Sequence, residues 1–318
     1  MPCAPASQAP ATGVVILLAC YQGGRYLREQ LASIAGQEHR DWRLVWRDDG
    51  SDDDTVAILH DFAAAQPPGR VTCFAGPAGR IGSAASFLAL LRHAAPTLGA
   101  HDIAAFADQD DVWLPLKLGR AVAALRGAAA AAPAIYTARQ VLVDARLDPL
   151  AISPALVPPT GFPASLTQNL ATGNTVALNP AAARLVAGSA APPGCQHDWW
   201  AYLLVTAAGG TLIADDEPVV LYRQHSANAV GAARSLLQRA AAAVWRGPGV
   251  FMGLVRQNLA ALDAQRHLLT PQACRDLDAI IAALQGSPRQ RLRALRLPGL
   301  RRQTWAEQVL FRLWFMLG

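Results

Sequence analysis

The sequence lacks the cysteine spacings that crosslink secreted domains or bind zinc. Its five cysteines are odd in number and widely scattered, and no C-x-x-C pair occurs. This pattern argues against a disulfide framework and against a cysteine-based zinc site. We therefore expect the protein to work in a reducing compartment.

Near its start the sequence also lacks a hydrophobic run long enough to cross a bilayer. The apolar run 14–20 is too short, and no positively charged segment precedes it as a signal peptide would require. Secretion is therefore not expected. The sequence predicts a protein of the cytoplasm or of the cytoplasmic face of a membrane.

Glycine-rich phosphate motifs are missing as well. Neither G-x-x-x-x-G-K-[ST] nor G-x-G-x-x-G is present, and Gly50 stands in the wrong order relative to the nearby acids for a calcium loop. A P-loop NTPase, a dinucleotide-binding domain and an EF-hand are thereby disfavoured.

Positive charge is concentrated at one end of the chain. The net charge is +5, but residues 285–318 hold seven arginines against one acid, Glu307, and so carry +6 alone. The rest of the chain is therefore about −1, which does not indicate a nucleic-acid-binding body. The seven arginines are Arg289, Arg291, Arg293, Arg296, Arg301, Arg302 and Arg312.

Short β-like runs alternate with helical periodicity over the first 140 residues. Strands are predicted at 14–19, 44–47, 71–75 and from 103, with helices around 27–34, 55–62 and 87–91. Such alternation is typical of βαβ units with a parallel sheet, whose ligands bind beyond the carboxyl ends of the strands. Further on, a long loop is expected at 145–163, a helix at 198–208, two strands at 211–214 and 219–222, and mostly helix after 232.

Three acidic residues lie close together directly after one predicted strand. The segment FADQDDVW places Asp108, Asp110 and Asp111 directly after the apolar run 103–107. Clustered carboxylates repel one another, and a cation offsets that repulsion. A solvated turn with a helix cap is the plainer alternative.

A second acidic cluster follows the strand 44–47. Helix capping accounts for the acids at 52–54, but it does not explain Asp48 and Asp49. A carboxylate at a strand end can accept the imide N–H of a pyrimidine base. The cluster therefore favours nucleotide binding.

Six short motifs occur in order along the chain: LACYQG (18–23), YLREQL (26–31), DDGSDD (48–53), DQDDVW (108–113), HDWW (197–200) and YRQH (222–225). Together they resemble family 2 glycosyltransferases, specifically the rhamnosyltransferase-like bacterial branch. The resemblance covers roughly residues 13–231, and the remainder matches only loosely.

The resemblance implies roles for particular residues. Ala19, Tyr21 and Asp48 would border the donor base, with Asp49 as neighbour. Asp108 and Asp110 match the D-x-D pair that meets the donor ribose and a divalent cation, Mg²⁺ or Mn²⁺, for which carboxylate and water oxygens are suitable ligands.

The later motifs imply a base and a closing loop. Asp198 matches the catalytic base, although the preceding position holds His197 instead of an acid. Arg223 and His225 fall where the family closes a loop over the diphosphate, and His225 is a further candidate metal ligand; it could equally make a structural hydrogen bond.

The acceptor side is less specific. Trp199 and Trp200 could stack on a sugar ring, yet aromatic residues that open a helix also pack in the core. Asn174 could line an acceptor cleft or belong to a turn. Arg80, in a glycine-rich loop, could reach a phosphate or remain solvated.

The C-terminal segment has an amphipathic pattern. At 100° per residue, one arc of 303–317 is apolar, and arginines precede it. This layout is typical of an interfacial helix on an anionic membrane, although a docking helix has the same arc. The arc comprises Trp305, Val309, Leu310, Leu313, Met316 and Leu317.

The sequence thus predicts an α/β fold of the GT-A type with a mostly parallel central sheet over residues 12–230, followed by a helical, basic segment at 231–318. That segment would contact a membrane surface or another subunit. The resemblance implies an inverting, metal-dependent enzyme that transfers a sugar, plausibly rhamnose or another deoxyhexose, from a nucleotide-diphosphate donor to a saccharide or lipid-linked acceptor in cell-surface polysaccharide assembly. A nucleotidyltransferase and a non-catalytic sugar-binding protein are the alternatives.

Overall fold

The computed structural model describes residues 12–77, 79–128, 131–225 and 236–318. Within these residues, nine strands form one mixed sheet in the order β3-β2-β1-β4-β8-β6-β9-β5, with β7 paired to β6. The strands are β1 (Val14–Cys20), β2 (Trp42–Asp48), β3 (Val71–Cys73), β4 (Ile103–Ala107), β5 (Val112–Trp113), β6 (Ala134–Val143), β7 (Pro149–Ile152), β8 (Ala177–Leu178) and β9 (Thr211–Arg223).

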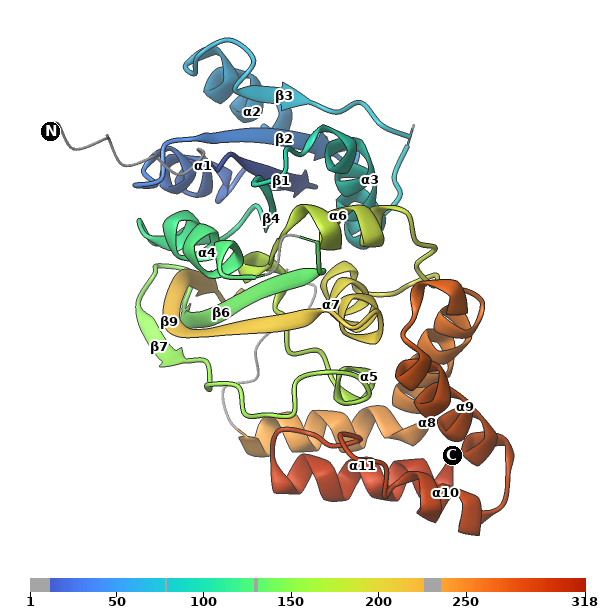
Figure 1. Ribbon diagram of the computed structural model, residues 1–318. Coiled ribbons are helices and arrows are strands. Elements are labelled where there is room, and N and C mark those ends of the chain that lie inside the picture. The colour runs from blue at the N-terminus through green and yellow to red at the C-terminus, as the bar shows by residue number, and fades with distance from the viewer. Residues whose placement is uncertain (1–11, 78, 129–130, 226–235) are drawn as a thin grey trace, which may run out of the picture.

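Helices cover both faces of the sheet and form the lower end of the molecule (Figure 1). The α-helices are α1 (Leu27–Ala35), α2 (Thr55–Ala64), α3 (Ser83–Ala94), α4 (Lys117–Arg126), α5 (Ala164–Thr167), α6 (Pro180–Ala187), α7 (His197–Ala207), α8 (Leu236–Asp263), α9 (Pro271–Gln285), α10 (Pro288–Ala294) and α11 (Trp305–Leu317). Short 3₁₀ turns occur at η1 (Ala95–Thr97), η2 (Gly173–Thr175) and η3 (Arg266–Leu268).

The alternation of side chains along β1 explains the layering. Val14, Ile16 and Leu18 pack with α1, α2 and α4 in one hydrophobic cluster, whereas Val15 and Leu17 pack with α3, α6 and α7 in the other. Because successive side chains of a strand point to opposite faces, one apolar run supplies both layers.

Parallel pairing aligns the carboxyl ends of the first strands. β1 runs parallel to β2 and to β4, with Cys20 opposite Asp48 and Leu18 opposite Ala107. The loops that follow these strands therefore lie at one edge, as expected for an α/β fold.

Two predicted features of the second half were wrong in detail. The expected loop 145–163 contains strand β7, whose side chains are all exposed, so it has no hydrophobic alternation that a sequence pattern would reveal. The two strands expected at 211–214 and 219–222 are one strand, β9, which is interrupted by register shifts against β6.

The C-terminal helices share the core of the sheet domain. Leu259, Leu277 and Phe311 belong to the same buried cluster as Leu166 and Trp200. The expected boundary between residues 230 and 231 lies outside the described residues. In the part of the chain that the structure describes, no helix is both long and apolar enough to cross a membrane.

Helix α11 differs from the predicted arc. Phe311, Trp314 and Phe315 form its buried face. Leu310 and Met316, two members of the predicted apolar arc, are half-buried against the core. The predicted arc left out the aromatic residues that provide most of the docking face.

We expect Phe311→Ala to destabilise the protein by about 3–5 kcal/mol, since it removes a buried aromatic ring and leaves a cavity. Leu313→Ala, two residues away and 53% exposed, should change stability by less than about 0.5 kcal/mol. Urea unfolding of both variants measures the difference. Equal effects would mean that α11 does not dock through this face.

Candidate active site

Three loops at the carboxyl edge of the sheet are tied to one another. After β1, the Tyr21 amide donates to Gln109 Oε1 (2.9 Å), and Gln109 Nε2 donates back to the Tyr21 carbonyl (2.8 Å). The Gln22 amide donates to Ser51 Oγ at 2.8 Å, in the loop after β2. A Cβ at Gly23 would collide with the Gln109 amide group, so this close approach requires glycine.

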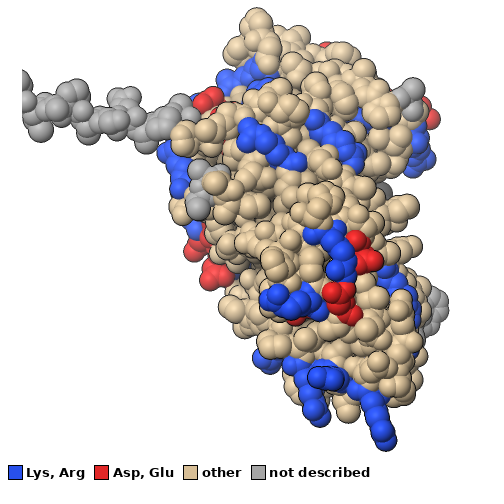
Figure 2. Space-filling view, turned by 45° about the vertical axis from the view of Figure 1, so that its right-hand side comes forward, with Lys and Arg blue, Asp and Glu red and all other residues tan. Residues whose placement is uncertain are grey.

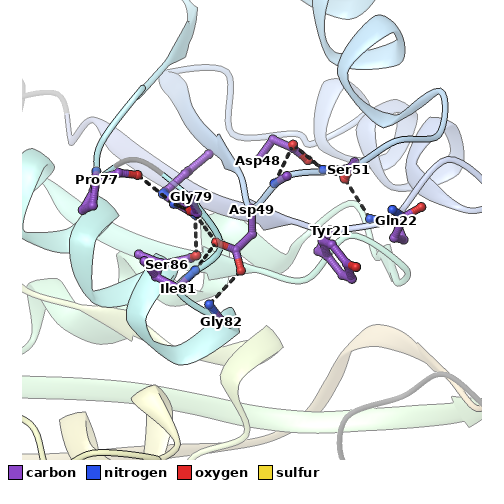
Figure 3. A network of polar contacts seen from close by, with 12 residues as sticks. Tyr21, Gln22, Asp48, Asp49, Ser51, Pro77, Gly79, Ile81, Gly82 and Ser86 are labelled. Carbon is purple, nitrogen blue, oxygen red and sulfur yellow. Dashed lines mark hydrogen bonds and ion pairs between the residues drawn. The ribbon is translucent and has the colours of Figure 1, made fainter.

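Asp48 shapes the loop after β2 and retains acceptor capacity. Its Oδ2 accepts hydrogen bonds from the Gly50 amide (3.0 Å) and the Ser51 amide (2.8 Å), and its Oδ1 accepts from the Ser51 hydroxyl. Since an ionised carboxylate offers about four lone-pair positions, one remains for a ligand. Figure 3 shows Asp48 and Tyr21 in the same close-up of this edge.

Asp49 has a different environment from its neighbour. It is buried, and it accepts from Arg47 Nη1 (2.6 Å) and from the amides of Ile81 (2.8 Å) and Gly82 (2.7 Å) (Figure 3). Burial would raise the pKa of this carboxyl, but the bonds from Ile81, Arg47 and Gly82 outweigh it and hold the pKa below its ordinary value. Asp49 therefore holds the loop that precedes α3.

Arg47 is the centre of that attachment, and the sequence reasoning did not find it. Its guanidinium also donates to Ser86 Oγ (2.8 Å) and to the carbonyls of Pro77 (3.1 Å) and Gly79 (2.9 Å). An arginine that directly follows the apolar run 44–46 and stands two residues before Asp49 was the available signal. Buried charges of this kind are paired or strongly destabilising.

The loop held by Arg47 also positions Arg80. The Arg80 guanidinium carbon lies 3.9 Å from the centre of the Tyr21 ring. This is a cation–π contact rather than the purely solvated position that the sequence left open. Arg80 thus covers the residue expected beside the donor base.

The acids after β4 divide into an outward and an inward group. Asp108 and Asp110 are partly exposed, whereas Asp111 is fully buried and accepts hydrogen bonds from Asn174 Nδ2 and from the Arg223 amide (3.1 Å). Burial and the charge of Asp110 raise the pKa of Asp111 to about 7. Asp111 is therefore part of the support beneath the site.

Asn174 lies in this support and not in an acceptor cleft. Its side chain is buried, donating to Asp111 and accepting from Gln140 Nε2. The backbone carbonyl of Asn174 accepts a hydrogen bond from Lys117 Nζ at 2.7 Å. Burial lowers the pKa of Lys117, the only lysine of the chain, to about 7. The predicted acceptor contact of Asn174 does not fit these bonds.

Arg223 is also turned inward. It is 1% exposed, and its guanidinium donates to the Asp110 carbonyl (3.0 Å), the Ala145 carbonyl (2.7 Å) and Glu29. It supports the backbone of the acidic motif from behind, which differs from the direct donor contact that was expected.

His225 lies beside the outward acids. Its Nε2 is 3.0 Å from Asp110 Oδ2, and its ring stacks on Tyr26 with centroids 4.9 Å apart. The structure thus brings together two of the three expected metal ligands. Among the described residues, however, no three His, Cys, Asp or Glu side chains are placed to hold a metal ion together.

That arrangement is compatible with a cation shared with a ligand. Mg²⁺ in phosphate-transfer sites takes one or two carboxylates and fills its remaining positions with phosphate oxygens and water. Partial burial and the neighbouring acids Asp111, Asp110 and Asp198 raise the pKa of Asp108 well above its ordinary value. A positive charge at this edge would relieve that repulsion.

Asp198 opens helix α7 on the other side of the site. Its Oδ2 accepts from the Gly173 amide (2.9 Å), and its Oδ1 from the Trp199 amide (2.7 Å). A Cβ at residue 173 would lie 3.1 Å from His197 Nε2, so glycine permits the approach. The side chain of Asn174, the residue after Gly173, donates to Asp111, so the segment 173–174 links Asp198 to the acidic motif.

The residues around Asp198 are mostly structural. His197 is buried and stacked on Phe87, with ring centroids 4.0 Å apart, and burial lowers its pKa. Trp200 is 1% exposed and donates to Ser189 Oγ (2.9 Å), so its predicted acceptor role was wrong. Trp199 is half-buried and donates to the Ser165 carbonyl (2.8 Å).

We expect Arg47→Met to destabilise the protein by about 3–5 kcal/mol, since it leaves the buried Asp49 carboxylate without its cation. Arg43→Met, in the same strand but more exposed, should cost less than about 1 kcal/mol. Urea unfolding measures both. If both variants lost the same free energy of unfolding, the Arg47–Asp49 pair would contribute no more to stability than the more exposed Arg43.

The same pair predicts a pH dependence. Because the folded pKa of Asp49 is lowered, its stabilisation is complete above the unfolded value of about 3.9 and is lost as the pH falls through the folded value. With Asp49→Asn, the free energy of unfolding should therefore fall less steeply as the pH is lowered below about 4. An unchanged fall at acid pH would contradict the role given to Asp49.

Known proteins resemble this chain in sequence and in fold. A dTDP-rhamnosyl transferase, RfbG of Shigella flexneri, is 27% identical over 225 residues, which are 68% of this chain and 74% of that protein. An uncharacterised glycosyltransferase of Nostoc, alr2836, is 30% identical over 110 residues, or 34% of this chain and 31% of that protein.

A solved structure shares the fold. The crystal structure of S. aureus TarS 1–349 in complex with UDP-GlcNAc superposes with a TM-score of 0.53 at 14% identity, covering 79% of this chain and 66% of that one. The expected GT-A-type fold is thereby confirmed. The sequence model of glycosyl transferase family 2 matches residues 15–177, about half of the chain, and the chain belongs to that family.

Proposed function

We propose that this protein is an inverting glycosyltransferase that moves a sugar from a nucleotide-diphosphate donor to a hydroxyl group of a saccharide or lipid-linked acceptor. Family membership supports the reaction class. The observation that carries the proposal is the hydrogen-bonded link between Asp198 and the acidic motif: Asp198 accepts from the Gly173 amide, and the side chain of the next residue, Asn174, donates to Asp111. In this proposal, Asp198 acts as the base and Asp108 lies on the donor side.

Asp198 is the proposed base. It would accept the proton of the acceptor hydroxyl while that oxygen forms a bond to C1 of the donor sugar. The bond from C1 to the phosphate oxygen breaks, and the nucleoside diphosphate leaves with the electron pair. A single displacement inverts C1, and a positioned base contributes about 10²–10⁴-fold to such a step.

The donor would lie along the loops after β1, β2 and β4. Ala19, Tyr21 and Asp48 are proposed to border the base, and Asp49 holds the adjoining loop in place. Asp108 and Asp110 would hold a divalent cation, with His225 beside Asp110. Such a cation, when bound, stabilises the charge of the leaving diphosphate as a Lewis acid.

The proposed sugar is rhamnose or another deoxyhexose. Support comes from the name of the Shigella relative, a dTDP-rhamnosyl transferase. A role in cell-surface polysaccharide assembly is proposed on the same ground. Incubation with a panel of nucleotide sugars would identify the donor by nucleoside diphosphate release. Release of pyrophosphate instead would indicate a nucleotidyltransferase.

We expect Asp110→Asn to lower transfer by about 10³-fold, since a lost Lewis acid is worth several kcal/mol. Asp61→Asn, which removes an exposed carboxylate of α2, should leave activity unchanged. Product formation with Mg²⁺ or Mn²⁺ and with EDTA measures both effects. Full activity in EDTA would remove the metal from the proposal.

Asp198→Asn should lower kcat by about 100-fold or more while leaving donor affinity nearly unchanged. Because Asp198 also accepts two backbone hydrogen bonds, thermal unfolding must be measured in parallel. A variant that transfers normally but unfolds early would make Asp198 a structural residue only.

A further inference from the structure

Helix α11 has a second apolar face that no described part of the chain covers. Besides its buried aromatic face, it exposes Trp305 (81%), Val309 (47%), Leu313 (53%) and Leu317 (66%). These residues recur every four positions, so at 100° per residue they follow one another along a single stripe of the helix. We call this stripe the apolar ridge.

Exposed arginines lie on the two C-terminal helices α10 and α11 and on the segment between them. The five are Arg289, Arg293, Arg296, Arg301 and Arg312. Within the described residues, none of the five takes part in an ion pair. The one acid of the segment, Glu307, lies 3.8 Å from Arg302.

The ridge and the arginines form one surface. Arg291 Nη1 on α10 donates to the Met316 carbonyl of α11 (2.9 Å), which fixes the two helices together. Figure 2 shows Lys and Arg side chains at the lower end of the molecule, where Figure 1 places the C-terminal helices. No acidic side chain is visible at the lowest part of that view.

We propose that this surface docks on an anionic membrane, with the apolar ridge in the headgroup region and the arginines against lipid phosphates. A lipid surface supplies both partners at once: an apolar layer for leucine and tryptophan, and negative charge for arginine. This docking does not depend on the proposed reaction.

A second copy of the chain fits this surface less well. In a two-fold contact the same patch meets itself, so the ridge of one protomer would bring its arginines towards those of the other. Like charges placed together in this way disfavour association. Nucleic acid would satisfy the arginines but not the exposed leucines and tryptophan.

The test uses the full chain and sedimentation with vesicles. Phosphatidylcholine mixed with phosphatidylglycerol should bind the protein at low salt, and phosphatidylcholine alone should bind it much less. Arg293→Gln with Arg312→Gln should weaken binding about 30-fold, near fivefold for each residue, and reduce its salt dependence. Trp305→Ser with Leu313→Ser should weaken binding to the anionic vesicles at every salt concentration.

Matched substitutions elsewhere serve as controls. Leu116→Ser removes a 51% exposed leucine at the start of α4, and Arg28→Gln removes an exposed arginine of α1. Neither should change binding, and thermal unfolding of every variant checks the fold. The proposal is overturned if the full chain ignores anionic vesicles at low salt, or if the ridge substitutions instead convert a dimer to a monomer in analytical ultracentrifugation.

Discussion

At the carboxyl edge of the sheet many carboxylates lie close together, and the structure of this edge depends on the positive charges that offset them. Acids follow both β2 and β4, and parallel pairing brings these strand ends together. Three buried cations support these segments from inside the protein: Arg47 pairs with Asp49, Lys117 donates to the backbone carbonyl of Asn174 beside Asp111, and Arg223 donates to the Asp110 carbonyl. Without these cations the carboxylates would carry an uncompensated burial cost.

This compensation divides the acids into two kinds. Asp49 and Asp111 are committed to protein partners, so they fix loops and strand ends. Asp48, Asp108 and Asp110 are each partly exposed. Neighbouring aspartates of one motif therefore have different environments: one is buried and bonded to protein groups, and the next is partly exposed. The reason is that successive side chains at a strand end point in different directions.

Much of the architecture followed from the sequence alone. The alternation of apolar runs with helical periodicity predicted the parallel strands β1, β2 and β4, and the positions of their acidic ends. The short motifs, in their order, indicated the family that the chain matches. Local signals of this kind suffice where an element is periodic and its clustered acids lie directly at its end.

Only the tertiary structure shows which of the predicted site residues are buried and bonded within the protein and which are exposed. Trp200, Asn174 and Arg223 carry the residue types of a binding site, yet packing and hydrogen bonds commit each of them to the interior. The face by which α11 docks was likewise fixed by its neighbours. An amphipathic pattern records that a face is apolar, but which apolar face meets the core depends on the shape of the surface it packs against.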